Sequence, residues 1–146
     1  MEQKSIPDFI VFDDDVINNL ICEKIIQTTI PGAIVQTFTE PERGLEYILA
    51  TYADDNSNNA ILFLDINMPS LNGWEVLDKL DEFPDVVKGH IKIFMLSSSV
   101  DPLDTEKARD NPLVSGYIMK SLSQVKLRAV FPDCINPAVR PTVAIP

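Results

Sequence analysis

The chain carries four short apolar runs that have the length and composition of β-strands. They are rich in aromatic and β-branched residues, which favour strands. Nearly unbroken apolar runs of this kind are typical of strands covered on both faces, as in parallel sheets. A fifth run, residues 33–38, is more polar and fits an edge strand. The four apolar runs are residues 9–12, 61–64, 91–96 and 116–119.

Helical patterns lie between these runs. Residues 102–110 are charged and predict a short, exposed helix, and a last helix is expected over about residues 122–130. Strand and helix alternate five times, which predicts a doubly wound α/β sandwich with helices on both faces of a parallel sheet. Apolar residues recur at three-to-four spacing after each of the first three strands: Ile17, Leu20, Ile21 and Ile25; Leu45, Ile48, Leu49 and Tyr52; Val76, Leu77, Leu80 and Phe83.

Helix-breaking residues mark the boundaries between these elements. Pro31 and Gly32 are expected to end the first helix, and Pro84 is expected to end the third. His90 then falls in a loop before the fourth strand, where we expect it to be solvated. Residues 132–146 contain four prolines without a helical period, so we expect an extended or disordered tail after one domain over residues 6–131.

Length and composition narrow the class of protein. A chain of 146 residues suits one domain with its own core. The formal net charge of −10 argues against nucleic-acid binding, which needs a basic surface. No apolar run approaches the roughly 18 residues of a membrane span, and residues 1–5 show no signal-peptide pattern, so we expect a cytoplasmic location. Cys22 and Cys134 are too far apart in sequence to indicate a disulfide framework or a zinc site.

Acidic residues directly follow two of the predicted strands. Asp13, Asp14 and Asp15 come after the first strand, and Asp65 comes after the third. Because ligands of open parallel sheets bind at the carboxyl ends of the strands, we expect these acids to converge. Crowded like charges need a cation, and Mg²⁺ binds a few carboxylates together with water and phosphate oxygens. Asp15 opens the first helix, and we interpret it as a helix N-cap.

Two further strand ends carry Ser97 and Lys120. A hydroxyl can donate a hydrogen bond to a phosphoryl oxygen, and an ammonium group can pair with phosphate or carboxylate. A phosphorylated aspartate carries added negative charge that a metal, a lysine and a hydroxyl can stabilise together. Each group alone would mean little, but the set at successive strand ends indicates a phosphorylation site.

In this order the motifs resemble the response-regulator receiver domains of two-component, His-Asp phosphorelay systems. The resemblance covers about residues 6–131 and implies a flavodoxin-like, doubly wound (βα)5 sandwich with a five-stranded parallel sheet of order 2-1-3-4-5. The matching motifs are Phe-Ile-Val-Phe-Asp-Asp at residues 9–14, Leu-Phe-Leu-Asp-Ile-Asn-Met-Pro at 62–69, Asn-Gly at 72–73, Met-Leu-Ser-Ser at 95–98 and Gly-Tyr-Ile-Met-Lys at 116–120.

The resemblance implies roles for the residues around the first and third strand ends. Asp65 would be the phosphoacceptor, which attacks the phosphohistidine of a histidine kinase or histidine phosphotransfer protein. Asp13 and Asp14 would hold Mg²⁺ together with Asp65, and Asn67 would contribute its backbone carbonyl. Asn67 also occupies one of two positions that tune autodephosphorylation in such domains.

The resemblance also implies roles for residues around the fourth and fifth strand ends. Ser97 would be the switch hydroxyl, Ser98 would reach the phosphate through its backbone amide, and Lys120 would contact the phosphoryl group. Tyr117 matches the aromatic residue whose ring moves inward on activation. Ser99 occupies the second position that tunes autodephosphorylation.

One position departs from the family pattern. Family members commonly have proline after the lysine, in a cis peptide bond, whereas Ser121 follows Lys120 here. A cis bond without proline costs roughly 2.5–4 kcal/mol, so the sequence leaves the cis or trans state of this bond open.

The implied function is that of a stand-alone phosphorylation switch rather than an enzyme. Its output would be protein binding, to a target that the sequence does not name, and phosphorylation-dependent dimerisation is open. One alternative is a phosphorylation-independent interaction module on the same fold, although degenerate receivers usually lose an acid or the lysine. Another is a haloacid-dehalogenase-type phosphatase, whose Asp-x-Asp pattern the Asp13-Asp14-Asp15 run superficially fits, but this leaves Asp65 and Lys120 loosely explained.

Overall fold

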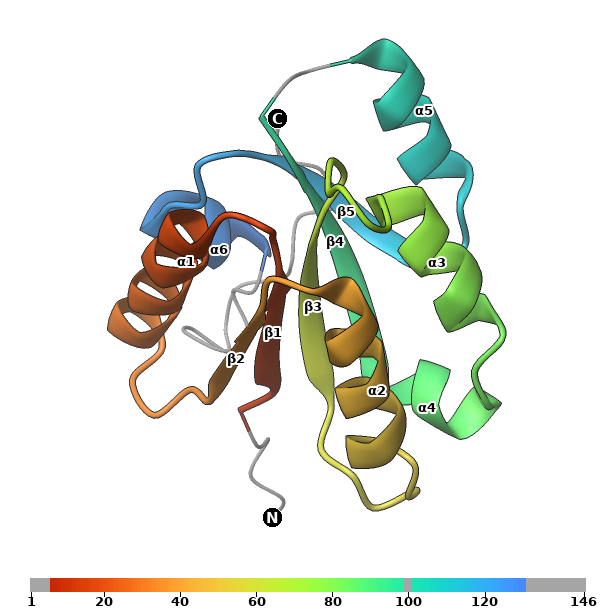
Figure 1. Ribbon diagram of the computed structural model, residues 1–146. Coiled ribbons are helices and arrows are strands. Elements are labelled where there is room, and N and C mark those ends of the chain that lie inside the picture. Colours follow the sequence, from red (N-terminus) through yellow and green to blue (C-terminus); the bar gives the residue numbers. More distant parts are fainter. Residues whose placement is uncertain (1–5, 99–100, 131–146) are drawn as a thin grey trace.

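Five strands pair in parallel into one sheet, in the order β2-β1-β3-β4-β5 (Figure 1). The computed structural model describes residues 6–98 and 101–130. The sheet order and the doubly wound arrangement confirm the fold class predicted from the sequence. The strands are β1 (Asp8–Phe12), β2 (Val35–Phe38), β3 (Ala60–Asp65), β4 (Ile91–Ser97) and β5 (Val114–Met119).

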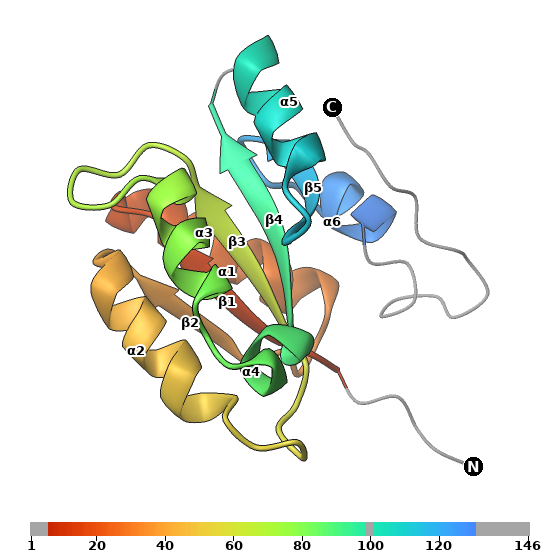
Figure 2. The same cartoon turned by 90° about the vertical axis from the view of Figure 1, so that its right-hand side faces the viewer.

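Helices cover both faces of the sheet. Helices α1 and α6 lie on one face, and the other four lie on the opposite face (Figure 1), which Figure 2 shows from the front. The six helices of the described residues are α1 (Val16–Thr29), α2 (Pro41–Thr51), α3 (Gly73–Asp81), α4 (Asp85–His90), α5 (Pro102–Asp110) and α6 (Gln124–Val130).

Alternate residues of the strands divide the apolar core into two parts. In β1, Phe9 and Val11 are buried with α1 and α6, whereas Ile10 and Phe12 are buried with α2 and α3. Every residue of β3 is buried, because this central strand is covered on both faces and paired on both edges. Burial on both faces explains why the sequence of the inner strands is almost continuously apolar. The more polar β2 is the edge strand that its sequence predicts.

Helix α4 was not expected from the sequence. Helix α3 ends at Asp81 rather than at Pro84, and Pro84 is the N-cap of α4, where its missing N–H costs no helical hydrogen bond. His90 is the last residue of this helix rather than a loop residue. Its imidazole nitrogens contact the carbonyl oxygen of Asp54 at 2.9 Å and Oδ1 of Asn59 at 3.3 Å. The predicted loop position was therefore wrong, and the partly exposed side chain joins α4 to the loop before β3.

Helix α1 turns a different face to the sheet than its apolar spacing suggests. The helix forms where the pattern predicts it, but several of its apolar side chains point to solvent. The buried positions include Asn18, Asn19, Cys22 and Ile26. Four apolar side chains of the helix are exposed and form a surface that we call the α1 patch: Val16, Ile17, Leu20 and Ile21. Periodicity alone therefore predicted the element correctly but not its orientation.

Two further features of the sequence, its cysteines and its tail, lie partly outside the described residues. Cys22 is a free, buried thiol, and burial together with the charge of Asp13 raises its pKa to about 12, so it stays protonated. Cys134 and the expected tail over residues 132–146 lie outside the described part of the chain. No described helix is both long and apolar enough to cross a bilayer.

The packing of two glycines yields a matched test of the core. A methyl group at Gly44 would overlap the ring of Phe12, which is fully buried, whereas one at Gly89 in α4 would meet nothing within 4 Å. Gly44→Ala should lower the free energy of unfolding by about 1–3 kcal/mol through overpacking. Gly89→Ala should raise it by up to about 1 kcal/mol through reduced freedom of the unfolded chain. Chemical denaturation measures both, and equal effects would contradict the packing described here.

Candidate functional site

The carboxyl ends of β1, β3, β4 and β5 meet at one edge of the sheet, the upper edge in Figure 1. Asp13 directly follows β1, Asp65 ends β3, Ser97 ends β4 and Lys120 directly follows β5. The strand register aligns them, because Asp65 pairs with Leu96 and Ser97 pairs with Met119. The four strand ends therefore bring together the acids, the hydroxyl and the lysine that the sequence singled out.

Asp13 is the most firmly held of these groups. Its side chain is completely buried and accepts hydrogen bonds from the Lys120 ammonium at 2.8 Å and from the Asn18 amide at 2.6 Å, both on Oδ2. The backbone N–H of Asp15 donates to the other oxygen at 2.9 Å. The Asn19 amide donates to the backbone carbonyl of Asp13 at 2.8 Å. A buried carboxylate needs such partners, because burial without them would be costly.

Lys120 bridges the two buried acids. Its Nζ lies 2.8 Å from Oδ2 of Asp13 and 3.3 Å from Oδ1 of Asp65. Burial alone would lower the pKa of Lys120, but its hydrogen bond to Asp13 and the charges of both acids outweigh this and raise the pKa above its ordinary value. The lysine therefore stays charged and offsets part of the negative charge of the acids.

Asp65 is nearly buried, with only 4% of its surface exposed. Burial and then the charge of Asp13 raise its pKa from 3.8 to about 6, although Lys120 and the backbone N–H of Asn67 act in the opposite direction. The Asn67 N–H donates to Oδ1 of Asp65 at 3.4 Å. At neutral pH the group is largely ionised, as a nucleophilic carboxylate must be.

Asp13, Asp14 and Asp65 form a cluster that could hold a cation. Each offers a carboxylate oxygen, and these oxygens all lie within 4.8 Å of one another. Asp14 is exposed, whereas the other two are buried. Lys120 supplies one positive charge for three carboxylates, so the cluster remains net negative. Mg²⁺ prefers oxygen ligands and keeps several of its waters when bound. A cluster of carboxylates with one exposed member therefore fits this ion.

Asp15 lies next to the cluster but points elsewhere. Its carboxylate accepts hydrogen bonds from the backbone N–H groups of Ile17 and Asn18 and so caps α1. The interpretation of Asp15 as an N-cap is correct, and this leaves Asp13 and Asp14 as the acids of this run that face the cluster.

The loop after Asp65 is packed closely against the end of β3. The N–H of Gly73 donates to the carbonyl of Ile66 at 2.8 Å, and a methyl group at Gly73 would lie 2.9 Å from the carbonyl oxygen of Asp65. Only glycine fits this close approach. Asn72 and Glu75 then start α3 with a reciprocal capping box. Asn67 is exposed within this loop.

A backbone hydrogen bond joins the end of β4, which carries Ser97, to the residue after β5, Lys120. Ser97 is completely buried at the end of β4, and its carbonyl accepts a hydrogen bond from the Lys120 N–H at 2.7 Å. Ser98 is exposed, Tyr117 on β5 is half-buried, and Ser99 lies outside the described residues. The Tyr117 ring packs against the part of the core that contains Ile10 and Phe12.

The peptide bond between Lys120 and Ser121 is cis. Lys126 of α6 reaches back over this corner, and its ammonium group donates to the carbonyls of Met119 at 2.7 Å and Ser121 at 3.0 Å. Lys126 thus links α6 to the backbone on both sides of Lys120, at the place where the sequence departs from the family pattern.

Sequence reasoning missed Asn18, Asn19 and Lys126. The two asparagines follow the acidic run, where their polar side chains break the apolar period, and that irregularity was the available signal. Lys126 gave no signal, because its partners are backbone carbonyls that only the folded chain identifies.

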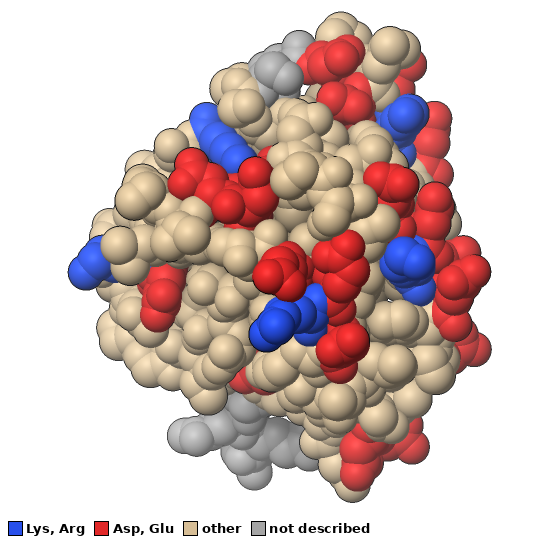
Figure 3. Space-filling model, viewed as in Figure 1, with Lys and Arg blue, Asp and Glu red and all other residues tan. Residues whose placement is uncertain are grey.

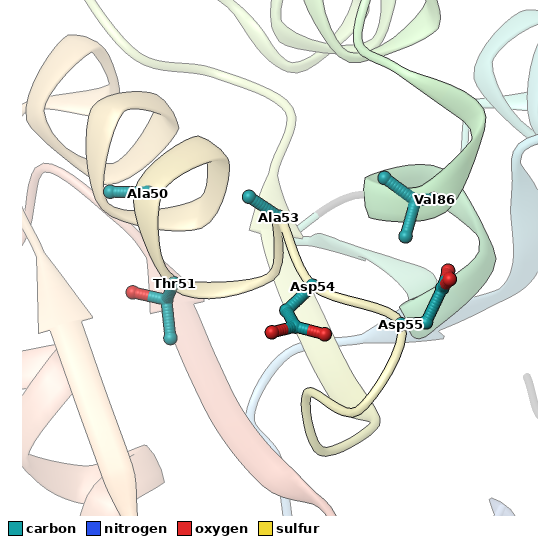
Figure 4. A pocket seen from close by; sticks show the side chains of 6 residues that line it. All are labelled: Ala50, Thr51, Ala53, Asp54, Asp55 and Val86. Carbon is teal, nitrogen blue, oxygen red and sulfur yellow. The ribbon is translucent and has the colours of Figure 1, made fainter.

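A separate hollow of about 570 Å³ lies at the opposite, amino-terminal end of the sheet. Its lining comes from the end of α2, the loop before β3 and α4 (Figure 4). Two small alanines, Thr51, Val86 and the acids Asp54 and Asp55 line it. None of the predicted site residues contributes to it.

Comparisons with known proteins show similar chains and folds. A crystal structure of a response regulator receiver protein from Dyadobacter fermentans is 27% identical, has a TM-score of 0.80, and covers 88% of this chain and 98% of its own. A two component response regulator from Cytophaga hutchinsonii is 30% identical, has a TM-score of 0.79, and covers 90% of this chain and 98% of its own. A comparison with curated proteins found no match.

More distant structures share the fold. The chemotaxis protein CheY4 from Vibrio cholerae is 17% identical with a TM-score of 0.68, and covers 89% of this chain and 99% of its own. A family model described as the response regulator receiver domain matches residues 9–131, which is most of the chain. This match, on a sheet of the predicted order with the acids and the lysine at its carboxyl edge, shows that the chain belongs to the response regulator receiver domain family.

Proposed function

We propose that this chain is a phosphorylation switch in which Asp65 accepts a phosphoryl group from a histidine kinase or histidine phosphotransfer protein. One observation carries the proposal: Lys120 bridges Asp13 and Asp65 beside a third carboxylate, at an edge where Ser97 also ends its strand. This combination of an ionisable nucleophile, a cation-binding cluster and two donors suits phosphoryl transfer, which depends mainly on positioning and charge stabilisation.

The residues present fit the metal that the family implies. Asp13, Asp14 and Asp65 would hold Mg²⁺ through their carboxylates, and Asn67 would hold it through its backbone carbonyl. When bound, Mg²⁺ supplies positive charge that offsets the charge of the transferring phosphoryl group. The net negative cluster, with one lysine for three acids, supports a requirement for this added charge.

The remaining steps of phosphoryl transfer are carried out by groups of the chain itself. A carboxylate oxygen of Asp65 attacks phosphorus, the bond from phosphorus to the donor's imidazole nitrogen breaks, and the bonding pair returns to that imidazole. Lys120 is already beside Asp65 and pairs with a phosphoryl oxygen. The Ser97 hydroxyl and the Ser98 backbone amide donate hydrogen bonds to the other oxygens. The chain thus promotes its own phosphorylation and slow dephosphorylation without turning over a separate substrate.

The signal would be a shift between two conformations. Phosphorylation draws the Ser97 hydroxyl toward the new phosphoryl group, and the Tyr117 ring moves into the space that it leaves. Because the carbonyl of Ser97 binds the N–H of Lys120, a movement at one strand end is transmitted to the next. A two-state population shift of this kind alters the surface around β5 and its neighbouring helices. Asn67 would tune the lifetime of the phosphorylated state, together with Ser99.

The surface beside the site supports a protein as phosphodonor. The α1 patch begins two residues after Asp14, and its residues Val16 and Ile17 are 66% and 63% exposed. Val125, on the neighbouring α6, is 75% exposed. A contiguous exposed apolar patch usually marks an interaction surface. We infer that a kinase or phosphotransfer protein docks here and presents its phosphohistidine to Asp65.

The cytoplasmic location, the downstream target and phosphorylation-dependent dimerisation stay predictions.

The two alternatives from the sequence are less well supported. A phosphatase of the haloacid-dehalogenase type would use Asp13 and Asp15 as its paired acids, but Asp15 is occupied in capping α1. A phosphorylation-independent module would not need the lysine bridge, whereas both acids of the bridge and the lysine are present and in contact.

Labelling with a small phosphodonor tests the acceptor directly. With acetyl phosphate and Mg²⁺, Asp65→Asn should reduce covalent labelling to background, and Asp15→Asn should leave it near the wild-type level, because asparagine also caps helices well. Phosphate incorporation and mass spectrometry measure this. Undiminished labelling of the Asp65 variant, or phosphate mapped to Asp13, would refute the assignment and favour the phosphatase alternative.

The raised pKa of Asp65 predicts a pH-dependent stability. Because the folded protein binds the Asp65 proton more tightly than the unfolded chain does, the metal-free free energy of unfolding should fall as the pH rises from about 4 through about 6. Asp65→Asn avoids this loss and should be more stable than wild type by about 3 kcal/mol at about pH 8, but not below about pH 4.

Adding Mg²⁺ should reverse that difference. At about pH 8, Mg²⁺ should stabilise the wild-type chain through binding to the folded state, and should stabilise the Asp65→Asn chain much less. Thermal or chemical denaturation with and without the metal measures both effects. Equal stabilisation of the two chains by Mg²⁺ would show that Asp65 is not part of the metal site.

Charge placed in the α1 patch tests the docking of the phosphodonor. Ile17→Glu should lower kcat/KM for transfer from a phosphorylated histidine protein at least roughly tenfold, because a carboxylate would be buried against an apolar partner. The rate from acetyl phosphate should stay unchanged, since the site itself is intact. Leu49→Glu, at an exposed leucine on α2, is the control. An equal loss of the transfer rate with both phosphodonors would mean that the substitution damages the site rather than the docking of the partner.

A further inference from the structure

A second hollow, of about 720 Å³, lies between α3 and α5. Its apolar lining comprises Trp74 and Leu77 of α3, Leu103 of α5, and the Pro112–Leu113 segment before β5. Leu103 is 68% exposed, although it is a large aliphatic side chain. We call this hollow the acidic groove, because its other lining residues are Asp78, Asp81, Asp101, Asp104, Glu106, Lys107, Asp110 and Asn111.

The charge of the groove is strongly one-sided. Six of the lining residues are acidic and one, Lys107, is basic. Within the part of the chain that the structure describes, only Asp81 among the six acids has an ion pair, with Lys88 at 3.7 Å. Figure 3 shows red acidic side chains gathered along the right-hand side of the molecule, where α3 and α5 lie. The groove thus combines an apolar floor with a rim whose charge is mostly negative.

The single cation in the groove shows which chemistry its wall accepts. The Lys107 ammonium lies over the ring of Trp74, 5.4 Å from its centroid. An indole face attracts cations, and it attracts guanidinium groups especially well. The wall therefore already holds a positive side chain, while among the six lining carboxylates only Asp81 has an ion pair within the described residues.

We propose that the acidic groove binds a basic peptide segment of a partner protein, one that carries at least one aliphatic side chain among its arginines or lysines. The aliphatic side chain would pack against Trp74 and Leu103, and the cations would pair with the rim. Charge complementarity of this kind speeds encounter and selects the partner. A second copy of this chain is disfavoured as the occupant, because two chains of net charge −10 repel each other.

Both walls of the groove follow, along the chain, a strand that ends at the candidate phosphorylation site. Helix α3 starts at Gly73, whose approach to the Asp65 carbonyl leaves no room for a methyl group. Helix α5 follows Ser97 along the chain, with Asp101 as its N-cap. Movement at either strand end is therefore expected to change the spacing of the walls. On the proposed function, the groove is then an output surface, and its occupant and the phosphoryl group affect each other's affinity reciprocally.

A peptide titration tests the proposal. The probe is a short synthetic peptide of alternating arginine and leucine, titrated into the whole chain and followed by the fluorescence of Trp74, the only tryptophan, and by calorimetry. Binding should perturb the Trp74 signal. The same peptide with glutamate in place of arginine should not bind, and one with serine in place of leucine should bind several-fold more weakly.

Charge reversal at matched positions locates the binding. Asp78→Lys with Asp110→Lys changes one exposed acid on each wall of the groove, and should weaken peptide binding roughly tenfold or more. Glu46→Lys with Asp55→Lys makes the same change in net charge at exposed positions away from the groove, and should weaken it less than about twofold. Equal losses in the two variants would mean attraction to net charge alone and would overturn the proposal, as would a failure of the wild-type chain to bind.

Two further measurements separate this proposal from the proposed function. The groove variant should still be labelled at Asp65 by acetyl phosphate, and Asp65→Asn should still bind the peptide. Mg²⁺ with beryllofluoride, which stands in for the phosphoryl group, should change the peptide affinity of the wild-type chain severalfold. An unchanged affinity would overturn the coupling. Sedimentation of the chain as a dimer through this face, without peptide, would overturn the choice of occupant.

Discussion

The crowding of carboxylates at one edge of the sheet is the constraint on which the rest of the structure depends. Asp13 and Asp65 are nearly or fully buried and face each other, with Asp14 beside them. Neither buried charge is tolerable alone, so the chain supplies Lys120 between them and amide donors around Asp13. Even so, Asp65 keeps a raised pKa. The site is thus held under electrostatic strain that a divalent cation, or a change in the charge of Asp65, would relieve.

Several features away from the site follow from this constraint. Helix α1 buries Asn18 and Asn19 against the sheet, because their amides bind the side chain and the carbonyl of Asp13. The apolar side chains of its first turns then face solvent and form the α1 patch beside the acids. The hydrogen bonds that Asp13 receives from the buried asparagines thus fix the orientation of α1. This orientation places the α1 patch on the surface beside the acids, where we propose that a phosphodonor docks.

The same site also anchors the elements that lead away from it. The loop after Asp65 is pinned to β3 by Gly73, and the Lys120 corner is pinned to Ser97 and to α6 through Lys126. Rigid connections of this kind allow a small change at a strand end to reposition a helix, since packed elements shift between discrete arrangements. One wall of the acidic groove, α3, is connected to the site in this way, and the other wall, α5, follows β4 along the chain.

The sequence by itself determined the alternation of strands and helices, the parallel sheet and the convergence of Asp13, Asp14, Asp65, Ser97 and Lys120 at one edge. Short apolar runs and strand-end polar residues are local signals, and the topology of a parallel sheet turns them into neighbours. Tertiary structure alone decided which face of α1 is buried, because the partners of Asn18 and Asn19 come from β1. It also decided the role of Lys126, the short helix after Pro84 and the acidic groove. Each of these depends on side chains or carbonyls that are distant in sequence or on packing between helices, and no local pattern records such contacts.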